Sequence, residues 1–378
     1  METARTKIIS AGHICLDITP AFPASAHRST GDLFLPGQLI SVGRAAVHLG
    51  GSVSNTGIAM KLLGGDVELM STVGDDAFGR MVVSELSRYG IEGGIHISPE
   101  AETSYSVILA PPGIDRIFLH HSGANDTFDA GQINWDTVKQ AGLFHFGYPT
   151  LMRRMYENQG EGLFRLLTAV KEAGCATSVD MAMVEESTEA GQTDWSAILE
   201  RCIPYIDFFV PSAEELCMML DRQRYHEWQE RARGADITSI LDIERDIRPL
   251  ADELLYFGAK VVLIKCGAPG LYLRTAGHER LLSVGGGMGE RLSHSWENLE
   301  YFEKSYVPDR LLSGTGAGDT TIAAFLTAVL KGYSWKDCLH LAAATGAMCV
   351  STYDALSGLK SFPELEKRIH AGWKKAGE

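Results

Sequence analysis

Short apolar runs alternate with longer stretches of helical periodicity along this chain, and this alternation constrains its fold more than any other feature. The apolar runs predict strands at residues 7–11, 67–73, 106–110, 117–120, 143–146, 176–180, 208–210 and 261–265. We expect helices at 55–63, 76–89, 160–173, 195–202, 213–220, 244–257, 317–331, 335–351 and 362–375. Strands that alternate with helices form a mainly parallel sheet with helices on both faces. The sequence therefore predicts an α/β protein.

Composition narrows the class of partner. The 378 residues carry 34 basic and 48 acidic side chains, a formal charge of −14, which argues against nucleic acid or an anionic membrane as a partner. The N-terminus lacks the apolar stretch of a signal peptide, and no apolar run approaches the length of a membrane span. The 7 cysteines are scattered, which is typical of reduced thiols. We expect a cytoplasmic protein with one domain over residues 1–378.

Four segments interrupt the alternating pattern. Residues 18–48 and 103–122 look like short β insertions, either a small side sheet that acts as a lid or surface excursions. The mixed charges of 222–248 favour a solvated helical insertion over a binding patch. Residues 285–306 begin with several glycines but lack the strand–turn–helix context of a dinucleotide fingerprint, so we expect a mobile loop there.

A glycine-rich turn runs into a helix late in the chain and carries the strongest functional signal. From Ser313 to Thr321 the sequence reads SGTGAGDTT, and an amphipathic stripe follows. Free amides and the dipole at a helix N-terminus bind phosphate, and small residues let the backbone approach it. Asp319 in the first helical turn either stabilises the helix or accepts a proton from an attacking hydroxyl. With the glycine turn in front of it, we predict that Asp319 is the base of a phosphoryl transfer.

A second polar group lies near the N-terminus. Asp17 closes the first predicted strand, and Gly50-Gly51 precedes Asn55 at the start of a helix. Open α/β sheets bind ligands at the carboxyl ends of their strands. Asp17 and Asn55 can hold sugar hydroxyls, although a turn residue and a helix cap are equally good descriptions of them.

These two stretches resemble, in the same order, the signatures of the ribokinase-like carbohydrate kinases, also called the phosphofructokinase-B family. The first covers residues 50–79, the second 315–319, and the resemblance extends from about residue 8 to 362. It implies a ribokinase-like three-layer α/β/α fold with a central mainly parallel sheet and a small β lid, for which 18–48 and 103–122 are the candidates. It also implies ATP and Mg²⁺ as cofactors and a hydroxyl of a sugar or sugar-like small molecule as the phosphate acceptor.

The resemblance further implies roles for individual residues. Asp319 is the catalytic base, and the anion hole is formed by Gly316, Ala317 and Gly318. The other implied roles are substrate binding by Asp17, Gly51, Asn55 and Asn125, nucleotide binding by Lys265, Gly267 and Thr315, and an indirect contact of Glu215 with the metal ion through water.

Three positions depart from the family pattern. Ser313-Gly314 replaces the usual Asp-Thr, and Ser212 replaces the Asn of the Asn-x-x-Glu motif that ends in Glu215. The late loop at 351–358 differs from the pattern of the monovalent-cation site, so the sequence does not predict activation by K⁺. The departures motivate one alternative, a catalytically weak sugar-binding regulator.

Two related kinases are further alternatives. A nucleoside kinase would need aromatic side chains that pack against the nucleobase of its substrate. A sugar-phosphate kinase would need extra cationic side chains near the substrate. The candidates are Phe22, Phe34 and Tyr148 for the first and Arg116, Arg153 and Arg154 for the second. A lid of this kind can also pair with a second lid, which predicts a homodimer.

Overall fold

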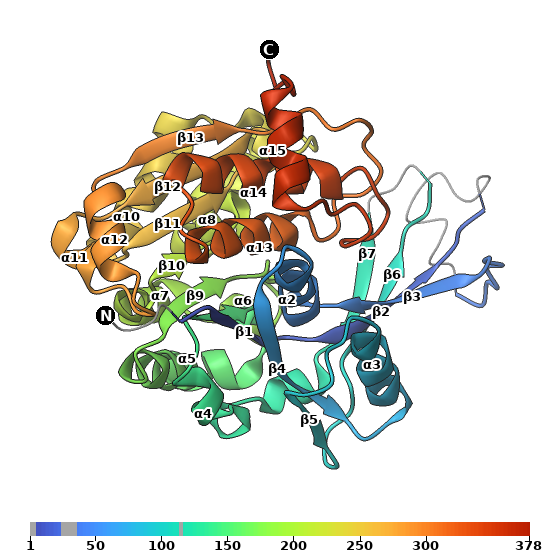
Figure 1. Cartoon of the computed structure of the whole chain (residues 1–378). Helices are drawn as coiled ribbons and strands as arrows, with labels where there is room; N and C mark the ends of the chain where they lie inside the picture. Colours follow the sequence, from blue (N-terminus) through green and yellow to red (C-terminus); the bar gives the residue numbers. More distant parts are fainter. Residues whose placement is uncertain (1–4, 24–35, 113–115) are drawn as a thin grey trace.

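The computed structural model describes residues 5–23, 36–112 and 116–378, and it is built around one large sheet (Figure 1). In spatial order the strands are β13 (Glu300–Lys304), β12 (Gly270–Thr275), β11 (Val261–Lys265), β10 (Phe208–Phe209), β9 (Ala176–Asp180), β8 (Leu143–Gly147), β1 (Lys7–Gly12), β4 (Asp66–Gly74) and β5 (Ile95–Ser98). Neighbours from β11 to β5 pair in parallel, whereas β12 pairs antiparallel with both β11 and β13. The predicted mainly parallel sheet is confirmed.

Both faces of the sheet are covered, as the apolar runs require. Successive side chains on a strand point to opposite faces. In β1, Ile8 packs into one core and Ile9 into the other, and Val261 and Val262 divide in the same way in β11. The two cores lie between the sheet and its two helical layers, so the predicted three-layer architecture is confirmed.

The helices form these layers. One layer, around α5 and α7, lies below the sheet in Figure 1, and α13 and α14 lie above it. The helices are α2 (Ser52–Leu62), α3 (Ala77–Arg88), α4 (Trp135–Val138), α5 (Arg153–Glu172), α6 (Glu189–Gln192), α7 (Trp195–Cys202), α8 (Ala213–Leu220), α9 (Arg222–Ala232), α10 (Arg248–Phe257), α11 (His278–Leu282), α12 (Gly289–Ser295), α13 (Ala317–Leu330), α14 (Trp335–Cys349) and α15 (Phe362–His370). None of the helices in the described ranges is long and apolar enough to cross a membrane.

A second, smaller sheet projects from the side of the molecule (Figure 1). Its strands lie in the order β3 (Ala45–Gly50), β2 (Cys15–Pro20), β6 (Tyr105–Leu109) and β7 (Ile117–His121). They come from the two predicted insertions, of which residues 24–35 and 113–115 lie outside the described residues. The predicted small β lid is confirmed.

Three sequence predictions are corrected. Residues 285–306 contain α12 and β13 rather than a loop, because Leu292 and Trp296 are buried against the sheet. The insertion at 222–248 is helical at α9, but it is not merely solvated, since Trp228 is buried. Helix α13 is buried almost all round rather than amphipathic, because α2 and α14 pack on both of its sides.

Candidate active site

The glycine turn and the head of α13 form the floor of the site. Gly316 caps the helix with a φ of 73°, and a Cβ there would lie 2.2 Å from the Cβ of Ala355. Glycine is the residue that reaches this left-handed conformation without strain, and here it also avoids a steric clash. The turn is therefore fixed in the shape that presents the first amides of α13.

The Asp319 carboxylate lies just behind these amides and accepts three hydrogen bonds. Its Oδ2 accepts from Asn55 Nδ2 at 3.0 Å. Its Oδ1 accepts from Thr56 Oγ1 at 3.2 Å and from the Tyr148 hydroxyl at 2.8 Å. Asp319 is 4% exposed. The three donors thus hold its side chain in one orientation.

Tyr148 is placed by an unusual backbone conformation at the end of β8. Its φ of 64° lies in the left-handed region, where a bulky side chain is rare. Burial and the nearby Asp319 charge raise the pKa of the phenol well above its ordinary value, so it stays a donor. Strained residues of this kind gather at functional sites.

A buried ion pair adjoins the glycine turn. Lys265 Nζ, at the end of β11, lies 2.7 Å from Asp180 Oδ1 at the end of β9. A Cβ built on Gly318 would lie 3.5 Å from the same Nζ, so the ammonium is next to the helix head. Burial lowers the pKa of Lys265, but the carboxylates of Asp180 and Glu215 raise it further, and the cation is retained.

The departure at Ser212 has a local explanation. Ser212 caps α8: Glu215 N donates to Ser212 Oγ at 3.3 Å, and Ser212 N donates to Glu215 Oε2 at 2.9 Å. This reciprocal pair is a capping box, which serine supports well. Glu215 keeps its position at the site, with one carboxylate oxygen engaged by the cap.

Two cavities meet at the glycine turn. The first, about 740 Å³, is called here the α14 cavity; it is lined by Asp180, Lys265, the 316–319 segment and one face of α14. The second, about 910 Å³, is called the lid cavity; it is lined by the lid strands together with Asn55 and Thr315. Gly314, Leu311 and Asp236 line both, so the turn separates two spaces large enough for small molecules.

The lining of the lid cavity includes polar and charged side chains. Asp17 belongs to the lid strand β2 rather than to the end of β1, which corrects the sequence reading. Its carboxyl lies over Gly50, where a Cβ would lie 2.4 Å away, and burial raises its pKa. Arg116, ahead of β7, donates to Thr315 Oγ1 of the turn. Lid and turn are therefore in direct contact.

Several predicted residues take other positions. Gly51 has a φ of 84°, and a Cβ there would lie 2.6 Å from His13 Nδ1, but it lines neither cavity. Asn125 is fully buried and bonds through its amide to the backbone N and O of Ile14. Thr315 lines the lid cavity rather than the α14 cavity. The ligand contacts of these three residues stay predictions.

The sequence predicted no role for Thr56 and Asp180. It offered Tyr148 as an aromatic contact for a nucleobase, whereas the structure shows a hydrogen bond from Tyr148 to Asp319. Thr56 follows Asn55 directly, and Asp180 ends a predicted strand, so position alone could have suggested both. The Tyr148 contact spans 171 residues and needs the folded chain.

Comparison with known proteins shows the family of this chain. The family model described as pfkB family carbohydrate kinase matches residues 6–361. The 2-dehydro-3-deoxygluconokinase of Bacillus subtilis is 23% identical over 340 residues, 89% of this chain and 90% of its own.

Solved structures share the fold at low identity. The ribokinase of Arabidopsis thaliana, solved with ribose and ATP, superposes with a TM-score of 0.68 at 19% identity, over 96% of this chain and 98% of its own. An E. coli structure solved with ATP and Mg²⁺ gives 0.69 at 20% identity, over 97% and 99%. Since the family model spans nearly the whole sequence, this chain is a member of the pfkB family of carbohydrate kinases.

Proposed function

We propose that this carbohydrate kinase transfers the γ-phosphoryl group of ATP to a hydroxyl of a sugar or sugar acid, with Asp319 as the base. One observation carries the proposal: the Asp319 carboxylate lines the α14 cavity with the head of α13, and it accepts a hydrogen bond from Asn55, which lines the lid cavity. A phosphate donor in the first cavity and an alcohol in the second would meet at this point. In-line transfer needs this arrangement and little covalent chemistry from the protein.

The hydrogen bonds on Asp319 suggest which oxygen accepts the proton. Oδ1 accepts from both Thr56 and Tyr148, whereas Oδ2 accepts from Asn55 alone among the described residues. A carboxylate oxygen offers about two acceptor positions. We therefore assign the base to Oδ2, which Asn55 holds toward the lid cavity that it lines.

The transfer then proceeds as follows. The acceptor hydroxyl gives its proton to Asp319 Oδ2 while its oxygen attacks the γ-phosphorus, and the bond to the bridging oxygen breaks. The amides of Gly316, Ala317 and Gly318 stabilise the charge on the transferred group, and Lys265 neutralises the phosphates. Asp17 accepts hydrogen bonds from other hydroxyls of the substrate.

The charges of the α14 cavity favour a nucleotide that carries a divalent cation. Its described lining includes five carboxylates and one cationic side chain, that of Lys265. This excess of negative charge would repel a triphosphate without a bound cation. The lining acids are Asp180, Glu214, Glu215, Asp236 and Asp319. Asp180 Oδ2 is buried and has no hydrogen-bond partner among the described residues. Asp180 and Glu215 fit Mg²⁺, which when bound would neutralise phosphate charge.

The alternative kinases find less support. Arg153 and Arg154 line neither cavity and pair instead with Glu157, which leaves Arg116 alone of the three cations proposed for a sugar phosphate. Of the aromatic candidates for a nucleoside, Phe22 lines neither cavity and Phe34 lies outside the described residues.

We also propose that residues 1–378 act as one kinase domain with the lid at 18–48 and 103–122. The homodimer through the lid stays a prediction, and activation by K⁺ is not predicted by the sequence. Sedimentation tests the first, and a comparison of K⁺ with Na⁺ tests the second.

A screen for ATP consumption tests the proposal. Pentoses, hexoses, sugar acids such as 2-dehydro-3-deoxygluconate, sugar phosphates and nucleosides would each be offered with ATP and Mg²⁺. We expect turnover with a sugar or a sugar acid. Turnover with nucleosides alone would overturn the substrate class, and ATP binding without turnover on any substrate would favour the regulator.

A further inference from the structure

The last residues of the chain form a tail that pairs with a segment next to the α14 cavity. Residues 373–378, here the tail, lie beyond the 6–361 stretch that the family model matches. Val307 N donates to Lys374 O at 2.9 Å, and Ala376 N donates to Ser305 O at 2.8 Å. This antiparallel pairing seats the tail on residues 305–307, which themselves line the cavity.

Side chains hold the tail in this position. The Trp373 ring stacks on Tyr306 with centroids 4.8 Å apart, and Trp373 Nε1 donates to Val307 O at 2.7 Å. The Arg368 guanidinium lies 3.7 Å from the centre of the Trp373 ring. Lys375 forms an ion pair with Glu303, whose side chain is fully buried. Such contacts are too specific for a loosely attached chain end.

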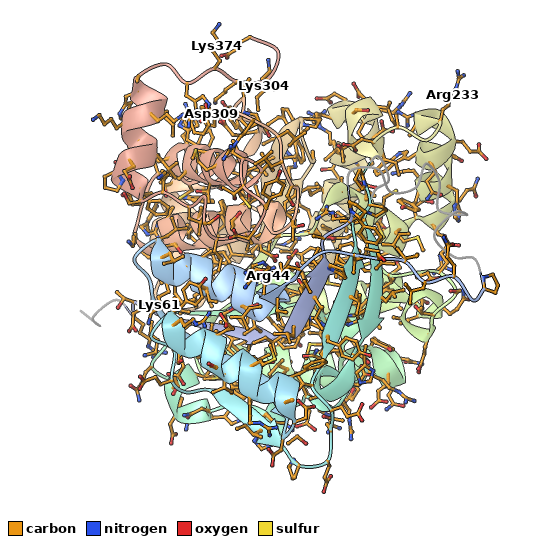
Figure 2. The ribbon with its side chains drawn as sticks, turned by 90° about the vertical axis from the view of Figure 1, so that its right-hand side faces the viewer. Arg44, Lys61, Arg233, Lys304, Asp309 and Lys374 are labelled. Carbon is orange, nitrogen blue, oxygen red and sulfur yellow. The ribbon has the colours of Figure 1, made fainter. Side chains whose placement is uncertain are left out.

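The tail reaches the cavity at one residue. Ala376 is among the lining residues of the α14 cavity, whereas the neighbouring Lys374 is exposed and is not. Figure 2 shows Lys374 at the top of the molecule, pointing to solvent near Lys304 and Asp309. The tail thus presents one side to the cavity and the other to water.

The part of the cavity that the tail adjoins is mainly apolar. The charged lining residues come from the ends of β9 and β11, from α8 and its insertion, and from α13, and they suit phosphates. The remaining wall comes from the tail, from the segment after β13 and from one face of α14, and its apolar members are Val307, Pro308, Ala343, Ala347, Val350 and Ala376. Apolar walls of this kind suit a flat heteroaromatic ring.

We propose that the tail, through Ala376, forms a wall of the subsite for the nucleotide's purine base and strengthens nucleotide binding. The proposal rests on the proposed function, because the base can occupy this side of the cavity when the phosphates lie at the glycine turn. The tail lies outside the region that the family model matches. We expect it to affect the binding of the nucleotide but not the binding of the sugar.

The test uses Ala376→Trp, which fills the base side of the cavity, and Lys374→Trp, which adds the same ring to the solvent side. Truncation is avoided because it would remove Lys375, an ion-pair partner of the buried Glu303 carboxylate. Calorimetry would give the dissociation constants of ATP and of inorganic tripolyphosphate, both with Mg²⁺. We expect Ala376→Trp to weaken ATP binding roughly tenfold or more while tripolyphosphate binding changes less than about twofold. Lys374→Trp should change neither.

Three outcomes separate the claims. If the wild type binds neither ATP nor another nucleotide, the proposed function itself fails. If it binds ATP and Ala376→Trp binds ATP equally well, or weakens tripolyphosphate to the same extent, the base wall is overturned. Should Ala376→Trp misfold, hydrogen exchange of the wild type decides: ATP with Mg²⁺ should protect the amides of 305–307 and 374–376, and tripolyphosphate should not.

Discussion

Replacing Tyr148 by phenylalanine tests how the base is held. The change removes one hydroxyl that donates to Asp319 Oδ1 at 2.8 Å and leaves the ring in place. The left-handed backbone at this residue is equally costly for both side chains, so the fold should be little affected. Thr56 would remain as the donor to Oδ1.

The expected magnitude follows from the type of bond. A hydrogen bond to a charged group contributes about 1.5–3 kcal/mol. If that energy orients Asp319 for proton transfer, kcat/KM should fall roughly tenfold to a hundredfold, since about 1.4 kcal/mol corresponds to tenfold in rate.

The assay measures steady-state phosphorylation of the best substrate from the screen between about pH 5 and 9. Tyr272→Phe is the matched control, because Tyr272 is also buried but donates to Glu300, away from the site. A Tyr148→Phe variant with wild-type kcat/KM would refute the role given to Tyr148. A fall in kcat/KM of the same size in Tyr272→Phe would refute it as well, because Tyr272 lies away from the site.

Three further changes have defined outcomes. Lys265→Met should lower the free energy of unfolding by about 3 kcal/mol, because it leaves Asp180 without its ion-pair partner, and it should raise the KM for ATP. The double variant with Asp180→Asn should recover the wild-type melting temperature but not the wild-type KM. Gly316→Ala should reduce kcat roughly a hundredfold by displacing the anion hole. Gly314→Ala should keep a normal melting temperature, because a Cβ there meets no atom of the described residues closer than 3.7 Å. Burial lowers the pKa of His145 from 6.5 to about 3. Below pH 6.5 the unfolded chain therefore binds a proton that the folded chain does not bind. The free energy of unfolding decreases as the pH is lowered through this range. Denaturant unfolding at pH 5 and pH 7.5 should show this contribution of about 2 kcal/mol, and it should be missing in His145→Gln.

Periodicity predicted the central layers of the fold but not its edges. The buried runs of β1, β8, β9 and β11 are long and apolar because helices cover both of their faces, and they were identified. The edge strand β13 was not predicted, since little of it is buried and the glycines before it suggested a loop. Its neighbour β12 was not predicted either, although nearly all of it is buried.

The site was predictable where function is carried by the backbone. The glycine turn and Asp319 form a contiguous motif, and their placement at a helix head follows from local sequence. The contacts of Tyr148 and of Arg116 join residues 171 and 199 positions apart, so they depend on how the sheet and the lid bring distant segments together. The stacking of Trp373 in the tail on Tyr306 likewise cannot be predicted from the local sequence.

The most direct test of the account is the turnover of Asp319→Asn. The amide keeps the shape of the side chain but cannot accept the proton from the acceptor hydroxyl. We predict that kcat falls roughly a hundredfold or more, while the dissociation constants of ATP and of the sugar change little. Turnover near that of the wild type would contradict the assignment of Asp319 as the base and the mechanism built on it.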